Sequence, residues 1–247
     1  MRLPCFQLLR RTAIGFLDLL YPPHCAICQC DTVAGEHLCT ECRKKAPVIT
    51  APFCQTCSEP FSGRIDTPFS CPNCRGRRFD FTCAVSRYQS RDVVRELIHR
   101  FKYGGKVYVR QVLGDWLEET LADTRLQSPP CDAIVPVPLH ATRQRERGFN
   151  QAAILAEDLA QRSGIRLCDC LKRIRYTTSQ TTFDREQRME NLRGAFQMRQ
   201  HRDVHNLHLL LIDDILTTGS TVHECARVLL DAGAASVRVA TVARAVK

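Results

Sequence analysis

Hydrophobic positions along the chain follow two spacings, and together these predict an α/β fold. A continuous apolar run at 209–212 is typical of a strand buried on both faces of a parallel sheet, and further strands are predicted at 133–137 and 237–242. Another strand is predicted over 79–88, followed by a helical stripe that ends near 101–106. Apolar residues recur every three or four positions at about 108–122 and 149–163, which predicts two more helices. Residues 79–247 are therefore predicted to form one sheet flanked by helices.

The N-terminal part has a different pattern. Residues 6–20 have the spacing of an amphipathic helix that ends before Pro22, so 1–20 is predicted to be a separate helix. Residues 21–78 contain four CxxC pairs and too small an apolar core to fold well without help. The predicted organisation is thus a helix over 1–20, a cysteine-rich unit over 21–78 and an α/β domain over 79–247.

The four CxxC pairs have the spacing of zinc knuckles, in which two thiolates chelate one ion and two knuckles complete a tetrahedral site. The predicted ligands are Cys25, Cys28, Cys39, Cys42, Cys54, Cys57, Cys71 and Cys74. The spacing leaves open whether consecutive pairs share an ion or the pairs interleave. A disulfide framework is the alternative, but the N-terminus does not read as a signal peptide, which favours a cytoplasmic location where thiols stay reduced.

The stretch LLLIDDILTTGST at 209–221 places acids and small hydroxylated residues directly after a predicted strand. The N–H groups at the start of the next helix favour an anion, and Gly219 allows the backbone to approach it. Asp213 and Asp214 would repel a phosphate, so we expect them to contact sugar hydroxyls. A sugar phosphate site is predicted from Asp213, Asp214, Thr217, Thr218, Gly219, Ser220 and Thr221. A plain helix start, a solvated acid or an acidic metal site is the alternative.

Three arginines follow the predicted strand at 133–137. We expect Arg143, Arg145 and Arg147 to lie in one loop, where guanidinium groups match the oxygens of pyrophosphate; a solvated basic loop is the alternative. The formal net charge is +9, and residues 85–110 hold seven basic and two acidic residues. This distribution is compatible with an anionic partner such as a phosphate or a nucleic acid.

The motifs together resemble a known family. The stretch at 209–221 resembles the signature of type I phosphoribosyltransferases, which hold phosphoribosyl pyrophosphate, and Arg147-Gly148-Phe149 resembles the pyrophosphate loop of adenine-type enzymes. With the CxxC pairs and the strings FKYGGK, IVPVPLH, RERGFNQA and RMENLRGAF, the chain is similar to the ComF/GntX family from Leu20 onward. The resemblance implies a double zinc ribbon followed by a type I phosphoribosyltransferase domain with a Rossmann-like parallel sheet. It also implies a cytoplasmic role in taking up or using DNA.

The resemblance also assigns roles to residues. It implies that Asp213 and Asp214 contact the ribose, that the loop 217–221 holds the 5′-phosphate, and that two zinc ions are structural. Mg²⁺ is expected to accompany phosphoribosyl pyrophosphate. Asp213, Asp214 and Arg147 are the catalytic candidates, and the further substrate contacts are Arg143, Arg145, Gly148, Gln180 and Arg185. Gln180 and Arg185 belong to the segment 171–196, which is expected to act as a flexible hood; a solvated charged helix is the alternative.

The acceptor of a phosphoribosyl transfer has no motif that the sequence reveals. A second hypothesis is therefore a non-catalytic adaptor that handles single-stranded DNA and binds phosphoribosyl pyrophosphate as a regulator. A third is a structural partner of proteins of the DNA-uptake machinery.

Overall fold

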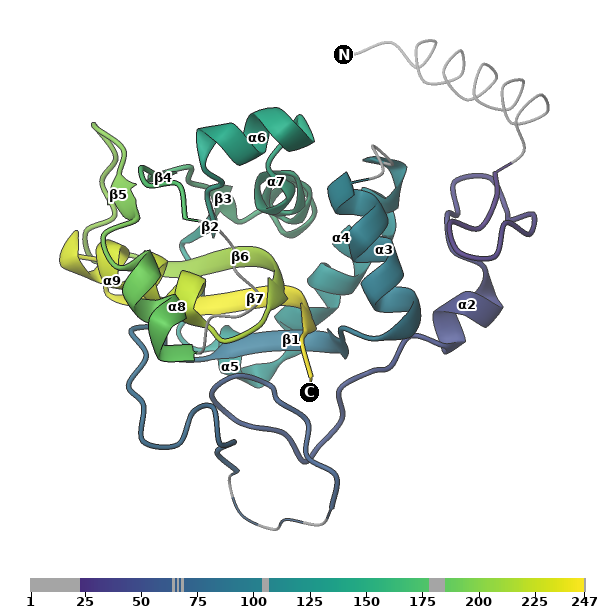
Figure 1. The fold of residues 1–247 in the computed structure, drawn as a ribbon, viewed down its shortest axis with the longest axis horizontal. Coiled ribbons are helices and arrows are strands. Elements are labelled where there is room, and N and C mark those ends of the chain that lie inside the picture. The colour runs from purple at the N-terminus through teal and green to yellow at the C-terminus, as the bar shows by residue number, and fades with distance from the viewer. Residues whose placement is uncertain are drawn as a thin grey trace.

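The computed structural model describes residues 23–63, 65, 67, 69–103, 107–177 and 185–246 (Figure 1). The helix predicted over 6–20 and the candidate contact Gln180 lie outside these residues.

A parallel sheet forms the centre of the C-terminal part, with its strands in the order β1-β7-β6-β2-β3 (Figure 1). The strands are β1 (Ala84–Gln89), β7 (Ser236–Arg244), β6 (His208–Leu216), β2 (Ala133–Pro136) and β3 (Arg166–Leu167). Every neighbouring pair in this order is parallel, which confirms the predicted α/β class. The strand predicted over 79–88 begins only at Ala84, because Phe79 and Phe81 pack against the loop before α9 instead.

Helices cover both faces of the sheet. The longer ones are α3 (Asp92–Tyr103), α4 (Arg110–Glu118), α7 (Gln151–Ser163), α8 (Arg185–Leu192) and α9 (Ser220–Asp231). Leu210 and Ile212 of β6 are buried with α3, α4 and α7, whereas Leu209 and Leu211 are buried with α9. Successive strand residues point to opposite faces, so burial on both sides explains the continuous apolar run.

Shorter elements connect these parts. They are α2 (Thr40–Lys44), η1 (Val107–Val109), η2 (Glu119–Ala122), α5 (Thr124–Gln127), α6 (Ala141–Arg147), β4 (Leu171–Arg173) and β5 (Phe196–Met198). The helix predicted over 108–122 is thus divided into η1, α4 and η2. Strands β4 and β5 pair antiparallel within the segment predicted to be a surface hood, so its two ends are ordered.

The cysteine-rich part covers the outer edge of the sheet. The N–H of Ile49 donates to the carbonyl of Arg87 at 2.8 Å, and the N–H of Gln89 donates to the carbonyl of Pro47 at 2.8 Å. The first CxxC pairs lie beside α3 and α4, and the next pairs lie below β1 (Figure 1). An edge strand left bare would offer unpaired backbone groups to other chains, and the residues between the two cysteine clusters prevent this at β1.

The motif RGFN at 147–150 turns the chain between two helices. Gly148 ends α6 with a φ of 81°, in the left-handed region that favours glycine. The side chain of Asn150 accepts from the N–H of Ala152 at 3.1 Å and donates to the carbonyl of Val137 at 3.0 Å. Asn150 therefore caps α7 and also fixes the exit of β2.

Asn150 provides a test of this arrangement. We expect Asn150→Ala to lower the free energy of unfolding by about 1–2 kcal/mol, because the cap and the bond to Val137 are both lost. Asn150→Asp keeps the cap acceptor but cannot donate to Val137, so its loss should be smaller. Urea denaturation of the three proteins measures the effect. An Asn150→Ala variant with the same free energy of unfolding as the wild type would contradict the prediction.

Candidate functional site

The two acids of the predicted sugar site lie within β6. The sequence indicated that they follow the strand, which is wrong, since β6 continues to Leu216. Asp213 pairs in register with Thr241 of β7, so this part of the strand still has a neighbour in the sheet. As consecutive strand residues, Asp213 and Asp214 point to opposite faces and meet different surroundings.

Asp214 forms an ion pair that the sequence did not suggest. Its Oδ2 lies 2.6 Å from Nζ of Lys102, near the end of α3, and its side chain is 8% exposed. A buried carboxylate is costly unless it is paired, so Lys102 compensates most of the charge at this face of β6. The apolar stripe at these positions predicted the helix α3. It could not predict that the last turn of this helix contacts β6.

Asp213 faces a different set of groups. Burial, and then the charge of Asp214, raise the pKa of Asp213 to about 7, while Lys102 opposes the shift. Burial, and then the charge of Arg143, lower the pKa of Arg173, and the charge of Asp213 counteracts this. Arg173 lies on β4, in the segment predicted to be a hood. Its closeness to Asp213 and Arg143 identifies it as a site residue that the sequence analysis missed.

The loop of the predicted phosphate site connects β6 to α9. Gly219 has a φ of 83°, and a Cβ at this position would meet the ring of Phe79 at 3.4 Å. The left-handed backbone and the aromatic ring behind it therefore both favour glycine here. The hydroxyls of Thr218 and Ser220 lie 2.9 Å apart, and α9 begins at Ser220. The N–H groups of the first turn of a helix have no partner within the helix, so this start can receive an anion.

The predicted arginine loop is a helix in the structure. Arg143, Arg145 and Arg147 lie on α6, a helix of seven residues on the surface. The expectation of a loop was wrong because the side chain of His140 accepts from the N–H of Thr142 at 3.2 Å and starts a helix. The N–H of Val137 donates to the carbonyl of Ile212 at 2.9 Å, so the chain that leads into α6 leaves the sheet beside Asp213.

Two arginines of α6 stack on exposed tyrosines. The guanidinium of Arg147 lies 5.0 Å from the ring centre of Tyr103 and donates to its hydroxyl at 3.0 Å. The guanidinium of Arg143 lies 5.9 Å from the ring centre of Tyr176. Tyr103 is 62% exposed and Tyr176 is 46% exposed, whereas most other aromatic rings near the sheet are packed inside. Cations and aromatic faces thus form one surface around α6.

The structure does not bring every candidate to the site. Gln180 lies outside the described residues, and Arg185 is the first residue of α8, where only its backbone is described. Helix α8 packs on α9, so the far end of the expected hood is anchored near the phosphate loop. The role of this segment stays a prediction.

The eight predicted zinc ligands form two clusters in sequential order. The first contains Cys25, Cys28, Cys39 and Cys42, and the second contains Cys54, Cys57, Cys71 and Cys74. The ligand atoms of each cluster lie within 4.8 Å of one another. Tetrahedral zinc with thiolate ligands separates the sulfurs by about 3.8 Å, and the Sγ atoms of Cys28 and Cys39 are 3.7 Å apart. The residues therefore fit zinc, and the question of interleaving is settled in favour of consecutive pairs.

The two clusters differ in exposure. Cys28 of the first cluster is exposed, and the Sγ of Cys30 lies 3.3 Å from its sulfur. All four cysteines of the second cluster are buried. A reagent that competes for metal therefore reaches the first cluster more easily than the second.

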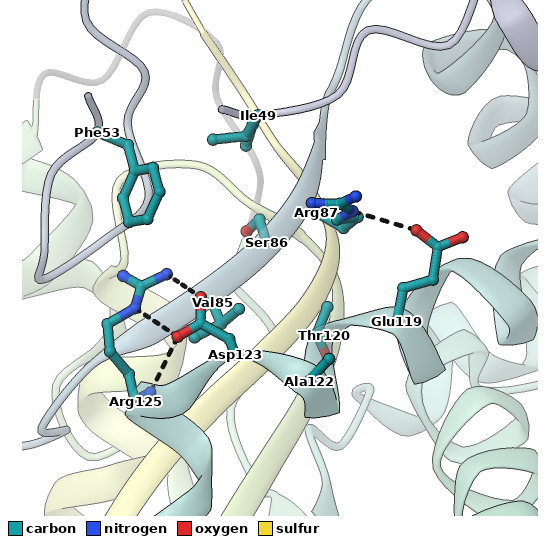
Figure 2. A pocket seen from close by; sticks show the side chains of 10 residues that line it. All are labelled: Ile49, Phe53, Val85, Ser86, Arg87, Glu119, Thr120, Ala122, Asp123 and Arg125. Carbon is teal, nitrogen blue, oxygen red and sulfur yellow. Dashed lines mark hydrogen bonds and ion pairs between the residues drawn. The ribbon is translucent and has the colours of Figure 1, made fainter. Parts of the chain in front are cut away.

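A separate cavity of about 480 Å³ lies between β1 and the residues that join the two clusters (Figure 2). Its charged side chains bind one another, since Arg87 lies 3.2 Å from Glu119 and Arg125 lies 2.7 Å from Asp123. Arg125 also stacks on Phe53. Arg125 also donates to the carbonyl of Gln55 at 3.0 Å and to the hydroxyl of Ser58 at 3.1 Å, so this one side chain links the cysteine-rich part to the α/β domain.

Helices long and apolar enough to cross a membrane are absent from the part of the chain that the structure describes.

Comparison with known proteins covers nearly the whole chain. A family model described as a double zinc ribbon domain matches residues 16–75, and one described as a phosphoribosyl transferase domain matches residues 148–246. The chain is 30% identical over 217 residues to competence protein ComFC of Bacillus subtilis, covering 85% of each chain. It is 29% identical to competence protein F of Haemophilus influenzae, covering 86% of this chain and 93% of that protein. It is also 29% identical to the DNA utilization protein YhgH of Escherichia coli K12, covering 90% and 96%.

The cysteine clusters predict a metal content. We expect close to two zinc ions per chain when the protein is purified without chelator, and one of them should exchange faster because Cys28 is exposed. Cys28→Ser should lower the content toward one zinc, whereas Cys131→Ser, outside both clusters, should leave it unchanged. Metal analysis of the three proteins decides this, and intact disulfides in place of zinc would refute it.

The raised pKa of Asp213 predicts a pH dependence of stability. In the unfolded chain the carboxyl of Asp213 loses its proton near pH 4, while in the folded chain it keeps the proton up to about pH 7. Because the folded state binds more protons in between, the free energy of unfolding should fall as pH rises through this window. Between about pH 5 and 7.5, the free energy of unfolding of the wild type should fall by on the order of 2 kcal/mol relative to that of Asp213→Asn. Urea titrations measure this, with Asp231→Asn as control, and parallel curves for wild type and Asp213→Asn would exclude it.

Proposed function

Because the chain belongs to the ComF family, we propose that it binds phosphoribosyl pyrophosphate with Mg²⁺ and transfers the phosphoribosyl group during the uptake or use of DNA. The relatives named as competence and DNA utilization proteins support the biological setting. We place the protein in the cytoplasm, where its zinc-binding thiols stay reduced.

One observation carries the proposal. An acidic pair lies two residues before the end of a buried parallel strand, and a glycine-containing loop of three residues leads from that strand into the start of α9. Ligands of open parallel sheets bind at the carboxyl ends of the strands, and the neighbouring strand β2 ends beside the same acids. A ribose near the acids at this end of the sheet and a 5′-phosphate on the loop fit this order of groups.

The proposed transfer breaks the bond between the anomeric carbon and pyrophosphate and forms a bond to an acceptor nucleophile. Asp213 and Asp214 hold the ribose hydroxyls, and the loop before α9 holds the 5′-phosphate. Arg143 and Arg147, with Arg173 nearby, supply positive charge for the departing pyrophosphate. Mg²⁺ bound with the substrate would supply further positive charge for the leaving group. Lys102 keeps Asp214 paired until the ligand enters.

Calorimetric titration at fixed Mg²⁺ tests ligand binding. Above pH 7, where Asp213 is ionised, the double variant Asp213→Asn with Asp214→Asn removes two charged acceptors, each worth about 1.5–3 kcal/mol, so affinity should fall at least tenfold. Asp231→Asn removes an exposed acid at the far end of α9 and should bind as the wild type does. Pyrophosphate release across nucleobases, amines and DNA then identifies the acceptor. Equal affinity in all three proteins, or no wild-type binding at millimolar ligand, would exclude the site.

A second function, the handling of single-stranded DNA, is favoured by the surface around α6. Exposed tyrosines that stack on arginines can receive bases on their faces while the arginines contact phosphates. Tyr103 and Tyr176 provide such faces, and Arg145 is exposed on the other side of the helix from Arg143 and Arg147. The same surface could guide a DNA strand past the ribose site without catalysis.

The DNA hypothesis predicts two separable effects. Tyr176→Ala should weaken binding of single-stranded DNA about 5- to 100-fold, because one stacking contact contributes about 1–3 kcal/mol. Arg145→Ala should reduce the slope of the logarithm of the binding constant against the logarithm of salt concentration by about one, the value for one phosphate contact. Tyr108→Ala is the matched control, since Tyr108 is 40% exposed but stacks on His37 of the first ribbon. Fluorescence anisotropy at several salt concentrations measures both, and absence of binding at low salt would remove this function.

A further inference from the structure

The second cysteine cluster lies directly behind the phosphate loop, and one buried arginine contacts both. Arg244, the last residue of β7, is 3% exposed. Its guanidinium donates to the carbonyl of Leu216 at 3.0 Å and to the carbonyl of Thr217. The other end of the same group lies 2.5 Å from the carboxylate of Glu59 and donates to Sγ of Cys57 at 3.8 Å.

The negative charge of the second cluster explains why an arginine is buried beside Cys57. Four thiolates around one zinc ion carry a net charge of about −2, and the second cluster is buried. A buried charge needs a partner, and donors to the ligand sulfurs are a regular part of metal sites. Arg244 meets this need at Cys57, while Glu59 fixes the orientation of the guanidinium. The cluster thereby determines where the remaining N–H groups of Arg244 point.

A donor from the second cluster itself continues the pattern. Asn73 lies within the knuckle between Cys71 and Cys74, and its Nδ2 donates to the carbonyl of Thr218 at 3.4 Å. Three consecutive carbonyls, those of 216, 217 and 218, thus accept from groups at the second cluster. In a trans peptide the C=O and the following N–H point in opposite directions. The N–H groups of residues 217 to 219 therefore face away from the ribbon, as an anion site on the other side of the loop requires.

The first cluster has a different place in the molecule. Cys25, Ala26 and Leu38 are buried with α3 and α4, and His37 stacks on Tyr108 at 4.9 Å between ring centres. The second cluster is instead buried together with Leu216 and Val222, which flank the phosphate loop. The two metal sites therefore support different parts of the domain.

We propose that Arg244 couples the second cluster to the phosphate loop, so that metal at Cys54, Cys57, Cys71 and Cys74 and an anion at the loop strengthen each other's binding. Arg244 is a positioning residue in this scheme, because it shapes the loop through backbone carbonyls. The identity of the anion rests on the proposed function, whereas the link between cluster and loop is independent of it. Coupling between two sites is reciprocal, which gives the proposal two separate tests.

The first test needs no ligand. Arg244→Met in the full zinc-loaded chain removes the donors and keeps an unbranched side chain. Arg238→Met is the matched control, since Arg238 is also buried on β7 and donates to the carbonyls of Leu126 and Pro129. Hydrogen exchange at residues 216–220 should be at least tenfold faster in Arg244→Met than in Arg238→Met. Equal exchange in the two variants would overturn the coupling, whatever the loss of global stability.

The second test uses phosphoribosyl pyrophosphate with Mg²⁺ and a colorimetric chelator. In Cys28→Ser, which is expected to hold metal only at the second cluster, saturating ligand should slow zinc release at least threefold. Adding Arg244→Met should abolish this protection, and adding Arg238→Met should preserve it. Protection that survives Arg244→Met overturns the coupling. A wild type that binds no ligand refutes the proposed function instead, and the hydrogen exchange result then decides the coupling alone.

Discussion

Burial of β6 on both faces is the constraint on which the rest of this structure depends. Leu209 to Ile212 have no exposed surface, because helices cover the sheet from both sides. A strand of this kind cannot carry polar chemistry along its length, since unpaired polar groups in the interior are costly. Polar residues are tolerated there only where they find partners, as Asp214 does in Lys102. Asp213 and Asp214 lie near the end of the strand, before the loop that leads to α9 and next to the exit of β2.

The alternation of strand side chains then separates two chemically identical acids. Asp214 points to the side of α3 and is paired with Lys102. Asp213 points to the side of α9, where burial and the neighbouring acid raise its pKa to about 7. One acid is thus held in an ion pair, and the other has a pKa near neutral pH. A difference of this kind comes from the pleat of the strand and from the two layers of helices, not from the side chains themselves.

Local patterns predicted the features that depend on neighbours in sequence. The apolar runs of β2, β6 and β7, the CxxC pairs and the glycine of the phosphate loop are all of this type, since each needs only a few consecutive residues. The helix α6 was missed because its start depends on a single capping contact of His140. The ion pair of Lys102 and the roles of Arg173 and Arg244 were missed for another reason. Each reaches its partner across the fold, and no spacing along the chain records such a contact.

The cysteine-rich part contacts both the edge of the sheet and the loop before α9. The residues between the clusters complete the hydrogen bonding of β1, and the second cluster lies against the carbonyl side of the phosphate loop. If this segment separated from the sheet, β1 and the loop before α9 would both lose hydrogen bonds. We infer that the cysteine-rich part and the sheet fold as one unit, although their sequences follow different patterns. Arg244 makes the connection to the loop, since one buried guanidinium donates both to a sulfur of the second cluster and to a carbonyl at the start of the loop before α9.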